Sequence, residues 1–163
     1  MPSKQKYDTL LIIIDLQKGW IHKTATEATM LRAAALAEKF DGDVIHCRFW
    51  NNPDSLFHKQ LQWKRFTENY DTEEIPEIAK LKLPTYWRDT YSVINDETLP
   101  IIKKYKHVYL AGVYTDISIA STAMGIFDLN IPVSVVKDCV ATLHGPTVHE
   151  AAIKSLGFAI GRD

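Results

Sequence analysis

The apolar residues of the chain fall into short runs that alternate with stretches of helical spacing. Tyr7–Asp15 is a run of aliphatic and β-branched residues, and similar runs span Asp43–Phe49 and His107–Gly112. Continuous apolar runs of this length are typical of strands buried on both faces of a parallel sheet. The pattern predicts a further strand over Ile131–Cys139 and a brief one over Thr85–Trp87.

Between the strands, apolar residues recur three and four positions apart, which is typical of amphipathic helices. This spacing predicts helices over Thr26–Phe40 and Ile117–Asn130 and a final helix after Pro146. Asn51–Leu83 has no such period, and we expect an irregular excursion with short helical pieces such as Glu73–Leu81. Within the second helix the row expected to be buried is Ile117, Ala120, Met124 and Phe127.

Strands that alternate with helices predict an α/β fold, a three-layer α/β/α arrangement around a mainly parallel sheet. In such sheets the ligand binds at the carboxyl ends of the strands. Polar residues follow or end three of the predicted strands: Asp15-Leu16-Gln17, Tyr114–Ser118 and Lys137-Asp138. We therefore expect the chemistry of the protein at this edge of the sheet.

Composition and charge narrow the class of protein. The chain has 163 residues, of which 46% are hydrophobic and 24% charged, and its net charge is -1. These values predict a single globular domain over residues 1–163 and argue against nucleic-acid or membrane-surface binding. No run reaches the ~20 apolar residues that cross a bilayer. Cys47 and Cys139 are too few for a disulfide framework, so we expect a cytoplasmic protein.

Several familiar chemistries lack their motifs in this sequence. Neither GxGxxG nor GxxxxGK[ST] occurs, so we expect no nucleotide cofactor. The histidines form no HxxxH pair and the cysteines no CxxC pair, so we expect no metal. A GxSxG nucleophile elbow is also missing, which argues against a hydrolase with a Ser-His-Asp triad.

Four segments carry a family resemblance, and together they run along nearly the whole chain. They are LLIIIDLQKGW (Leu10–Trp20), TYSVI (Thr90–Ile94), LAGVYTDISIASTAMGIFDLNIPVSVVKD (Leu110–Asp138) and HEAAIKSLGF (His149–Phe158). These segments resemble the isochorismatase-like hydrolases, also called the cysteine hydrolase superfamily. The resemblance implies the isochorismatase-like fold, a small-molecule substrate and assembly into homodimers or homotetramers.

The resemblance also implies a catalytic set of an Asp after the first strand, a Lys before the YS segment and a nucleophilic Cys. Asp15 matches the acid, Arg88 falls on the Lys position and Ser118 on the Cys position. It further implies a non-proline cis peptide in the Val113-Tyr114 region. The nicotinamidase metal site is not matched, because Phe49-Trp50-Asn51 offers neither Asp nor His.

The two replaced residues change the expected chemistry. A serine hydroxyl is far less acidic than a thiol, and a carboxylate is a poor base for it. Arg88 cannot exchange protons, but it can hold a carboxylate or an oxyanion. A purely structural role is the alternative for two of these residues. Asp15 could serve as a partner of Arg88 or of backbone N–H groups, and Ser118 could cap the N-terminus of its helix. Residues near the strand ends are expected to contact substrate, with plain core packing as the alternative for the aromatic ones: Gln17, Trp20, Phe49, Trp50, Tyr114 and Thr115.

Two hypotheses about function follow. In the first, the protein is a divergent hydrolase of a small polar molecule, cleaving an amide or ureido C–N bond or a vinyl ether. Asp15 is then the acid/base, Arg88 an electrostatic clamp, and Ser118 an oxyanion donor or weak nucleophile.

In the second hypothesis, the chain is a catalytically silent family member that serves as a small-ligand binding or assembly module. Trp63 and Phe66, in the irregular stretch, are expected to cover the crevice or an oligomer contact.

Overall fold

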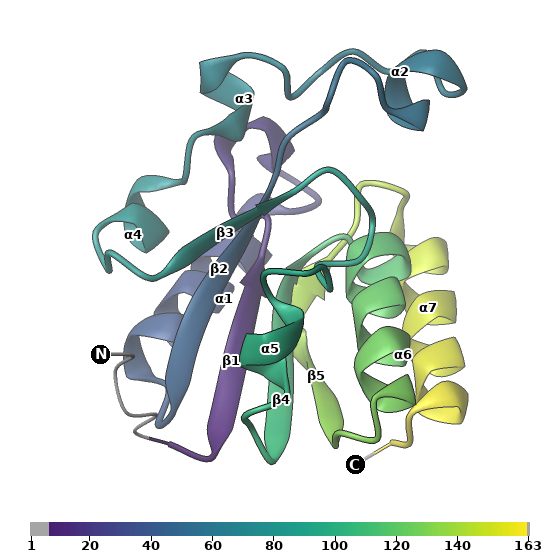
Figure 1. Ribbon diagram of the computed structural model, residues 1–163. Coiled ribbons are helices and arrows are strands. Elements are labelled where there is room, and N and C mark those ends of the chain that lie inside the picture. The colour runs from purple at the N-terminus through teal and green to yellow at the C-terminus, as the bar shows by residue number, and fades with distance from the viewer. Residues whose placement is uncertain (1–6, 163) are drawn as a thin grey trace.

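A five-stranded, fully parallel sheet forms the centre of the protein in a computed structural model that describes residues 7–162 (Figure 1). The strand order is β3-β2-β1-β4-β5, so the first strand lies in the middle. This confirms the predicted α/β class. The strands are β1 (Thr9–Ile14), β2 (Asp43–Phe49), β3 (Thr85–Arg88), β4 (His107–Val113) and β5 (Val133–Ala141).

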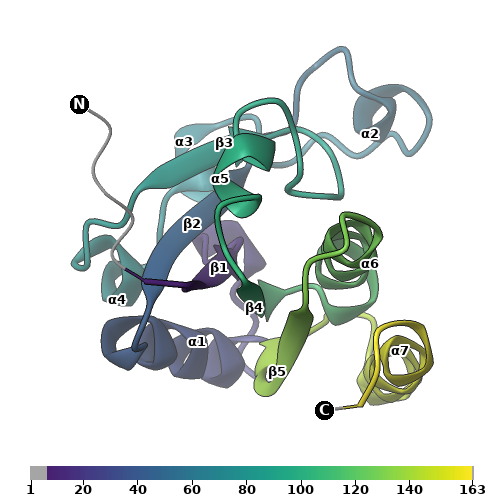
Figure 2. The same cartoon turned by 60° about the horizontal axis from the view of Figure 1, so that its bottom comes forward.

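Helices cover both faces of the sheet and complete the predicted three layers, as Figure 2 shows. On one face lie α1 (Glu27–Lys39) and α4 (Pro76–Ala79); on the other lie α5 (Leu99–Ile102), α6 (Ala120–Asp128) and α7 (Pro146–Ala159). The central strand contributes to both cores, because alternate residues of a strand point to opposite faces. Leu10, Ile12 and Ile14 pack on the α6 side, and Leu11 and Ile13 on the α1 side.

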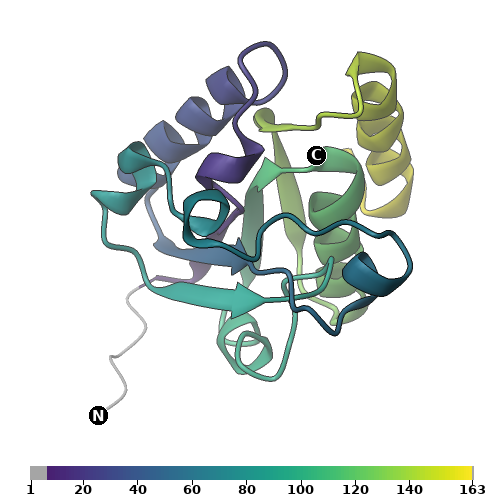
Figure 3. The ribbon, with the colours of Figure 1, turned by 90° about the horizontal axis from the view of Figure 1, so that it is seen from above.

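The irregular excursion between β2 and β3 runs over the carboxyl ends of the strands (Figure 3). It contains α2 (Leu56–Lys59), α3 (Asn69–Thr72) and α4. Outside the excursion, two short helical turns follow β1 and β4: η1 (Lys18–Trp20) and η2 (Thr115–Ile119). The expected helix Glu73–Leu81 is shorter than predicted. Ile75 is extended, as expected before Pro76, so α4 begins only at the proline.

The buried face of α6 differs from the one predicted. Met124 and Phe127 are 44% and 50% exposed, whereas Ile119, Ala123 and Ile126 are buried. Both rows have helical spacing, so periodicity alone does not separate them. The π-helical turn η2 precedes α6 and sets its phase, because a π turn holds an extra residue relative to an α turn. None of the helices in the described part of the chain is long and apolar enough to span a membrane.

Candidate active site

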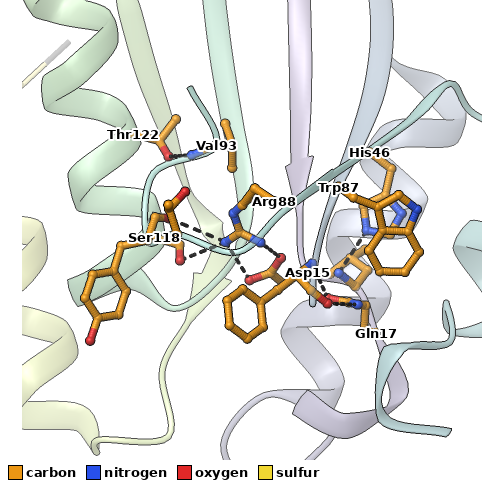
Figure 4. Close-up of polar contacts among 12 residues, drawn as sticks. Asp15, Gln17, His46, Trp87, Arg88, Val93, Ser118 and Thr122 are labelled. Atoms are coloured by element: carbon orange, nitrogen blue, oxygen red, sulfur yellow. Dashed lines mark hydrogen bonds and ion pairs between the residues drawn. The ribbon is translucent and has the colours of Figure 1, made fainter. Parts of the chain in front are cut away.

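Asp15, Arg88 and Ser118 meet at the carboxyl ends of the strands (Figure 4). Arg88 Nη1 donates to Asp15 Oδ1 at 2.5 Å, and Nη2 donates to Asp15 Oδ2 at 2.9 Å. The same Nη2 donates to Ser118 Oγ at 2.9 Å. All three residues are buried, with exposures of 3%, 5% and 7%. The three predicted catalytic residues therefore form one connected polar cluster.

The backbone around Asp15 is held by contacts with β2. Asp15 has φ +60°, and its N–H donates to Cys47 O at 3.0 Å. The next N–H, of Leu16, donates to His46 Nε2 at 3.1 Å, while His46 Nδ1 lies 2.8 Å from Glu74 Oε1. An imidazole that accepts at Nε2 and donates at Nδ1 is neutral. His46 thus ties the turn that carries Asp15 to the excursion.

Burial dominates the ionisation of this region. It raises the pKa of Asp15, and the charge and hydrogen bonds of Arg88 oppose that rise without cancelling it. Burial likewise lowers the pKa of His46 against the opposing hydrogen bond of Glu74, which agrees with the neutral imidazole deduced from geometry. Asp15 is therefore easier to protonate than an ordinary aspartate.

Ser118 is presented by an unusual backbone segment at the end of β4. Gly112 has φ +125°, and a Cβ there would lie 2.0 Å from Ile14 O, so no side chain fits. The peptide bond Val113-Tyr114 is cis, as the family resemblance implies. Ser118 Oγ accepts from Arg88, so its own hydrogen remains free to point elsewhere.

Asp15 and Ser118 lie at the wall of a cavity of about 330 Å³. Most of the other walls are aromatic, and many come from the excursion. Trp63 stacks on Trp20, with ring centroids 5.7 Å apart, and Phe57 meets Tyr91 edge-on at 5.0 Å. Beneath them Phe66, which is fully buried, stacks on Trp20. The cavity is lined by Asp15, Trp20, Phe49, Phe57, Leu61, Trp63, Arg65, Thr90, Tyr91, Tyr114, Ile117, Ser118, Leu143 and His144.

Of the six residues expected to contact substrate, Trp20, Phe49 and Tyr114 line this cavity. Gln17 does not. It is fully buried, its amide donates to Phe49 O at 2.9 Å and to Thr72 O at 3.0 Å, and it accepts from Phe49 N–H at 3.0 Å. The side-chain amide of Gln17 therefore satisfies the backbone N–H and C=O of Phe49, the last residue of β2, as a neighbouring strand would. This is a structural role.

Trp50 and Thr115 also lie outside the cavity lining. Trp50 is 41% exposed and follows the last residue of β2. Thr115 is fully buried, and its hydroxyl is 2.8 Å from His149 Nδ1 on α7. Adjacent residues point in different directions, and the neighbours Phe49 and Tyr114 take the cavity side.

Several other residues of the cavity come from segments whose positions the sequence pattern does not predict. Trp63 and Phe66 were predicted to cover the crevice or an oligomer contact; Trp63 lines the cavity and Phe66 supports it. Phe57 lies in the short helix α2, and Tyr91 and Arg65 lie in loops; no periodicity in the sequence fixes the position of any of the three. Arg65 is held by Asp71, with Nη2 to Oδ1 at 2.7 Å, and this hydrogen bond lowers the pKa of Asp71 against the effect of burial. His144 is also missed, and it comes from the loop before α7.

Neither cysteine lines the cavity. Cys47 is buried in the core, where burial raises the pKa of its thiol to about 12. Cys139 is 7% exposed and packs in the core on the α1 side, and burial raises its thiol pKa as well. Protonated thiols are weak nucleophiles, so both cysteines have a packing role here. No cluster of three or more His, Cys, Asp or Glu side chains with metal-binding geometry occurs within residues 7–162.

A buried acid, a guanidinium and a hydroxyl thus meet at the carboxyl ends of a parallel sheet, which is where ligands bind in α/β proteins. The sequence matches the isochorismatase domain model over residues 9–161. The chain therefore belongs to the isochorismatase family. No curated protein matches the sequence.

Solved structures share the fold at low sequence identity. An isochorismatase-like hydrolase from Alkaliphilus metalliredigens aligns with a TM-score of 0.76 and 14% identity, over 93% of this chain and 92% of that one. A nicotinamidase from Bacillus subtilis aligns at 0.76 and 17% identity, over 94% and 97%. A ribonuclease, MAR1, from Caenorhabditis elegans aligns at 0.74 and 16% identity, over 95% and 75%.

Proposed function

We propose that the protein is a divergent hydrolase of the isochorismatase family that acts on a small polar molecule bound in the aromatic cavity. The observation that carries this proposal is the presence of Asp15 and Ser118 at the wall of that cavity, with Arg88 hydrogen-bonded to both. In this scheme the carboxyl group of Asp15 transfers the proton. Arg88 stabilises the ionised form of Asp15, and Ser118 donates a hydrogen bond to the substrate.

Asp15 suits the role of acid and base because it is buried, lines the cavity and has a raised pKa. In its protonated form it donates a proton to the leaving side of the scissile bond. Water forms the new C–O bond and gives a proton back to the carboxylate, so the residue ends the cycle as it began. An amide or a ureido C–N bond can be cleaved in this way. In a vinyl ether the proton goes instead to the terminal vinyl carbon, water adds to the oxocarbenium carbon that results, and the hemiacetal or hemiketal then releases the alcohol.

Arg88 stabilises the carboxylate that forms when Asp15 gives up its proton, through the two hydrogen bonds already in place. Ser118 receives a hydrogen bond from the same guanidinium and directs its own hydrogen to substrate oxygen. A fixed donor such as this hydroxyl, aimed at developing negative charge, is an effective form of catalysis.

The cavity limits the substrate to a small molecule. Its volume of about 330 Å³ is at the lower end of the range for ligand sites. Stacked and edge-on rings such as Trp20, Trp63 and Tyr114 suit a planar or apolar part of the ligand. Arg65 on the same wall favours a neutral or anionic ligand over a cation.

A second candidate function has its own support. Both carboxylate oxygens of Asp15 are already engaged by Arg88, which cannot exchange protons. A site whose carboxylate is occupied by an internal ion pair in this way can bind a ligand without converting it to product. In that case the chain is a catalytically inactive family member that serves as a ligand-binding or assembly module.

A substrate screen separates the two functions. Wild type and Asp15→Asn are assayed against amides, ureido compounds and vinyl ethers, with thermal unfolding followed for each compound. Asparagine tolerates the positive φ of this position, which makes it the matched variant. Turnover lost in Asp15→Asn supports the hydrolase; ligand-dependent stabilisation without turnover supports the binding module. Turnover that survives the substitution unchanged removes Asp15 from the reaction.

A further inference from the structure

The cavity contains a second polar pair that the proposed role of Asp15 does not use. His144 and Asp116 are joined by a hydrogen bond of 2.7 Å between Nδ1 and Oδ2. The His144 side chain is 46% exposed and lines the cavity that Asp15 and Ser118 also line. Its partner Asp116 is mostly buried, with 17% of its side chain exposed.

The surroundings fix the orientation of this imidazole. Asp116 lies in η2, the same short turn that carries Ser118. The Tyr114 ring meets His144 edge-on, with centroids 5.3 Å apart, and the backbone N–H of His144 donates to Thr142 Oγ1 at 3.1 Å. The ring is therefore held on two sides by residues that flank the catalytic cluster.

The protonation pattern follows from the partner. Burial alone raises the pKa of Asp116, but the hydrogen bonds of His144 and Thr142 outweigh it and lower the pKa. An ionised carboxylate can only accept, so Nδ1 of His144 carries the hydrogen. With the hydrogen on Nδ1, Nε2 is the nitrogen that can accept a proton from the cavity. A carboxylate that orients a histidine in this way is the usual arrangement for a general base.

We propose that His144, oriented by Asp116, is a further catalytic residue of this cavity and acts as its general base. The inference rests on the proposed hydrolase function and deepens it. His144 Nε2 takes a proton from the attacking water as the water oxygen bonds to the electrophilic carbon. Asp15 gives its proton to the leaving group as that bond breaks, and His144 returns the proton taken from water to the Asp15 carboxylate through solvent.

This assignment supplies a proton acceptor that Arg88 and Ser118 cannot provide. Arg88 stays protonated, and Ser118 Oγ already accepts from it. An imidazole is the side chain used most often for this task. Division of the work between an acid and a base also means that Asp15 does not have to take the proton directly from the attacking water.

Kinetic variants test the proposal on whichever compound of the panel wild type hydrolyses. His144→Gln and Asp116→Asn are expected to lower kcat by about 100-fold or more, with KM within a few-fold of wild type. In His144→Ala, added imidazole is expected to restore part of the lost rate, which a merely structural role does not predict. His107→Gln is the matched control, because His107 hydrogen-bonds Ser134 at the opposite end of β4 and should leave kcat unchanged.

A second measurement needs no substrate. Nitrogen-15 NMR of the imidazole is expected to show the Nδ1–H tautomer in wild type and a changed tautomer mixture in Asp116→Asn. An Nε2–H tautomer in wild type overturns the proposal.

The kinetic outcomes separate this proposal from the one on which it rests. Full activity of His144→Gln together with loss of activity in Asp15→Asn overturns the role of His144 and still supports the hydrolase function. Loss in His144→Gln with full activity of Asp15→Asn supports His144 and removes Asp15. No turnover of any compound overturns both.

Discussion

The ion pair between Asp15 and Arg88 predicts strong energetic coupling between these two residues. Both side chains are almost fully buried and are joined by two hydrogen bonds of 2.5 and 2.9 Å. Removal of one member of a buried pair leaves the other charge unpaired, at a cost of about 3–5 kcal/mol. Arg88→Met and Asp15→Asn should therefore each destabilise the protein by this amount.

The double variant should be much less destabilised than the sum of the two single ones. With both charges removed, no buried ion remains unpaired, and we expect a coupling energy of about 2–3 kcal/mol. Urea unfolding of the four proteins at pH 7 measures this value as a double-mutant cycle. Ser118→Ala keeps the ion pair and serves as the control, with an expected loss of only about 1 kcal/mol.

Additive losses would refute this reasoning. They would show that the guanidinium and the carboxylate contribute independently, and therefore that the polar cluster is not the connected unit described above. A small loss in Arg88→Met alone would have the same meaning, because it implies that Asp15 is readily solvated without its partner.

Three further predictions concern the backbone and acid stability. Gln17→Leu should cost about 2–4 kcal/mol in denaturant unfolding, because it leaves three buried backbone groups without their partner; a loss below 1 kcal/mol contradicts the structural role. Gly112→Ala should cost about 3 kcal/mol or more, because its Cβ meets Ile14 O at 2.0 Å, whereas Gly157→Ala, inside α7, should be neutral or stabilising. His46 has a lowered pKa in the folded state, so the unfolded chain binds the proton more readily and stability should fall as the pH drops below about 6.5. His46→Asn should reduce this slope between pH 7.5 and 5.5, and an unchanged slope assigns it to other groups.

The sheet could be predicted from the sequence because its strands are nearly continuous apolar runs. β2 has the predicted bounds, and β3 and β4 each end one residue later than predicted. β1 is shorter than predicted by two residues at its start and by one at its end. β5 begins and ends two residues later than predicted, because Ile131 and Pro132 connect α6 to the strand. The positions of Asp15 and Ser118 followed from the strand ends and the family resemblance.

The walls of the cavity could not be predicted in the same way. Tyr91 and His144 lie in loops and Phe57 lies in the short helix α2. The path of the chain in these segments depends on tertiary contacts that leave no period in the sequence. Gln17 shows the opposite error. It stands at a strand end beside Asp15, as a substrate contact would, yet its amide is fully used by the backbone of β2 and α3. Hydrogen-bond partners of this kind are visible only in three dimensions.

The central claim is that Asp15, Arg88 and Ser118 act as one catalytic unit in this cavity. It is tested most directly by kcat/KM of Asp15→Asn, Arg88→Met, Ser118→Ala and the triple variant, all on one substrate that wild type hydrolyses. If the three groups serve a single step, the triple variant should lose little more than the most damaging single substitution. Losses that multiply across the three substitutions would contradict the account, as would a triple variant with wild-type activity.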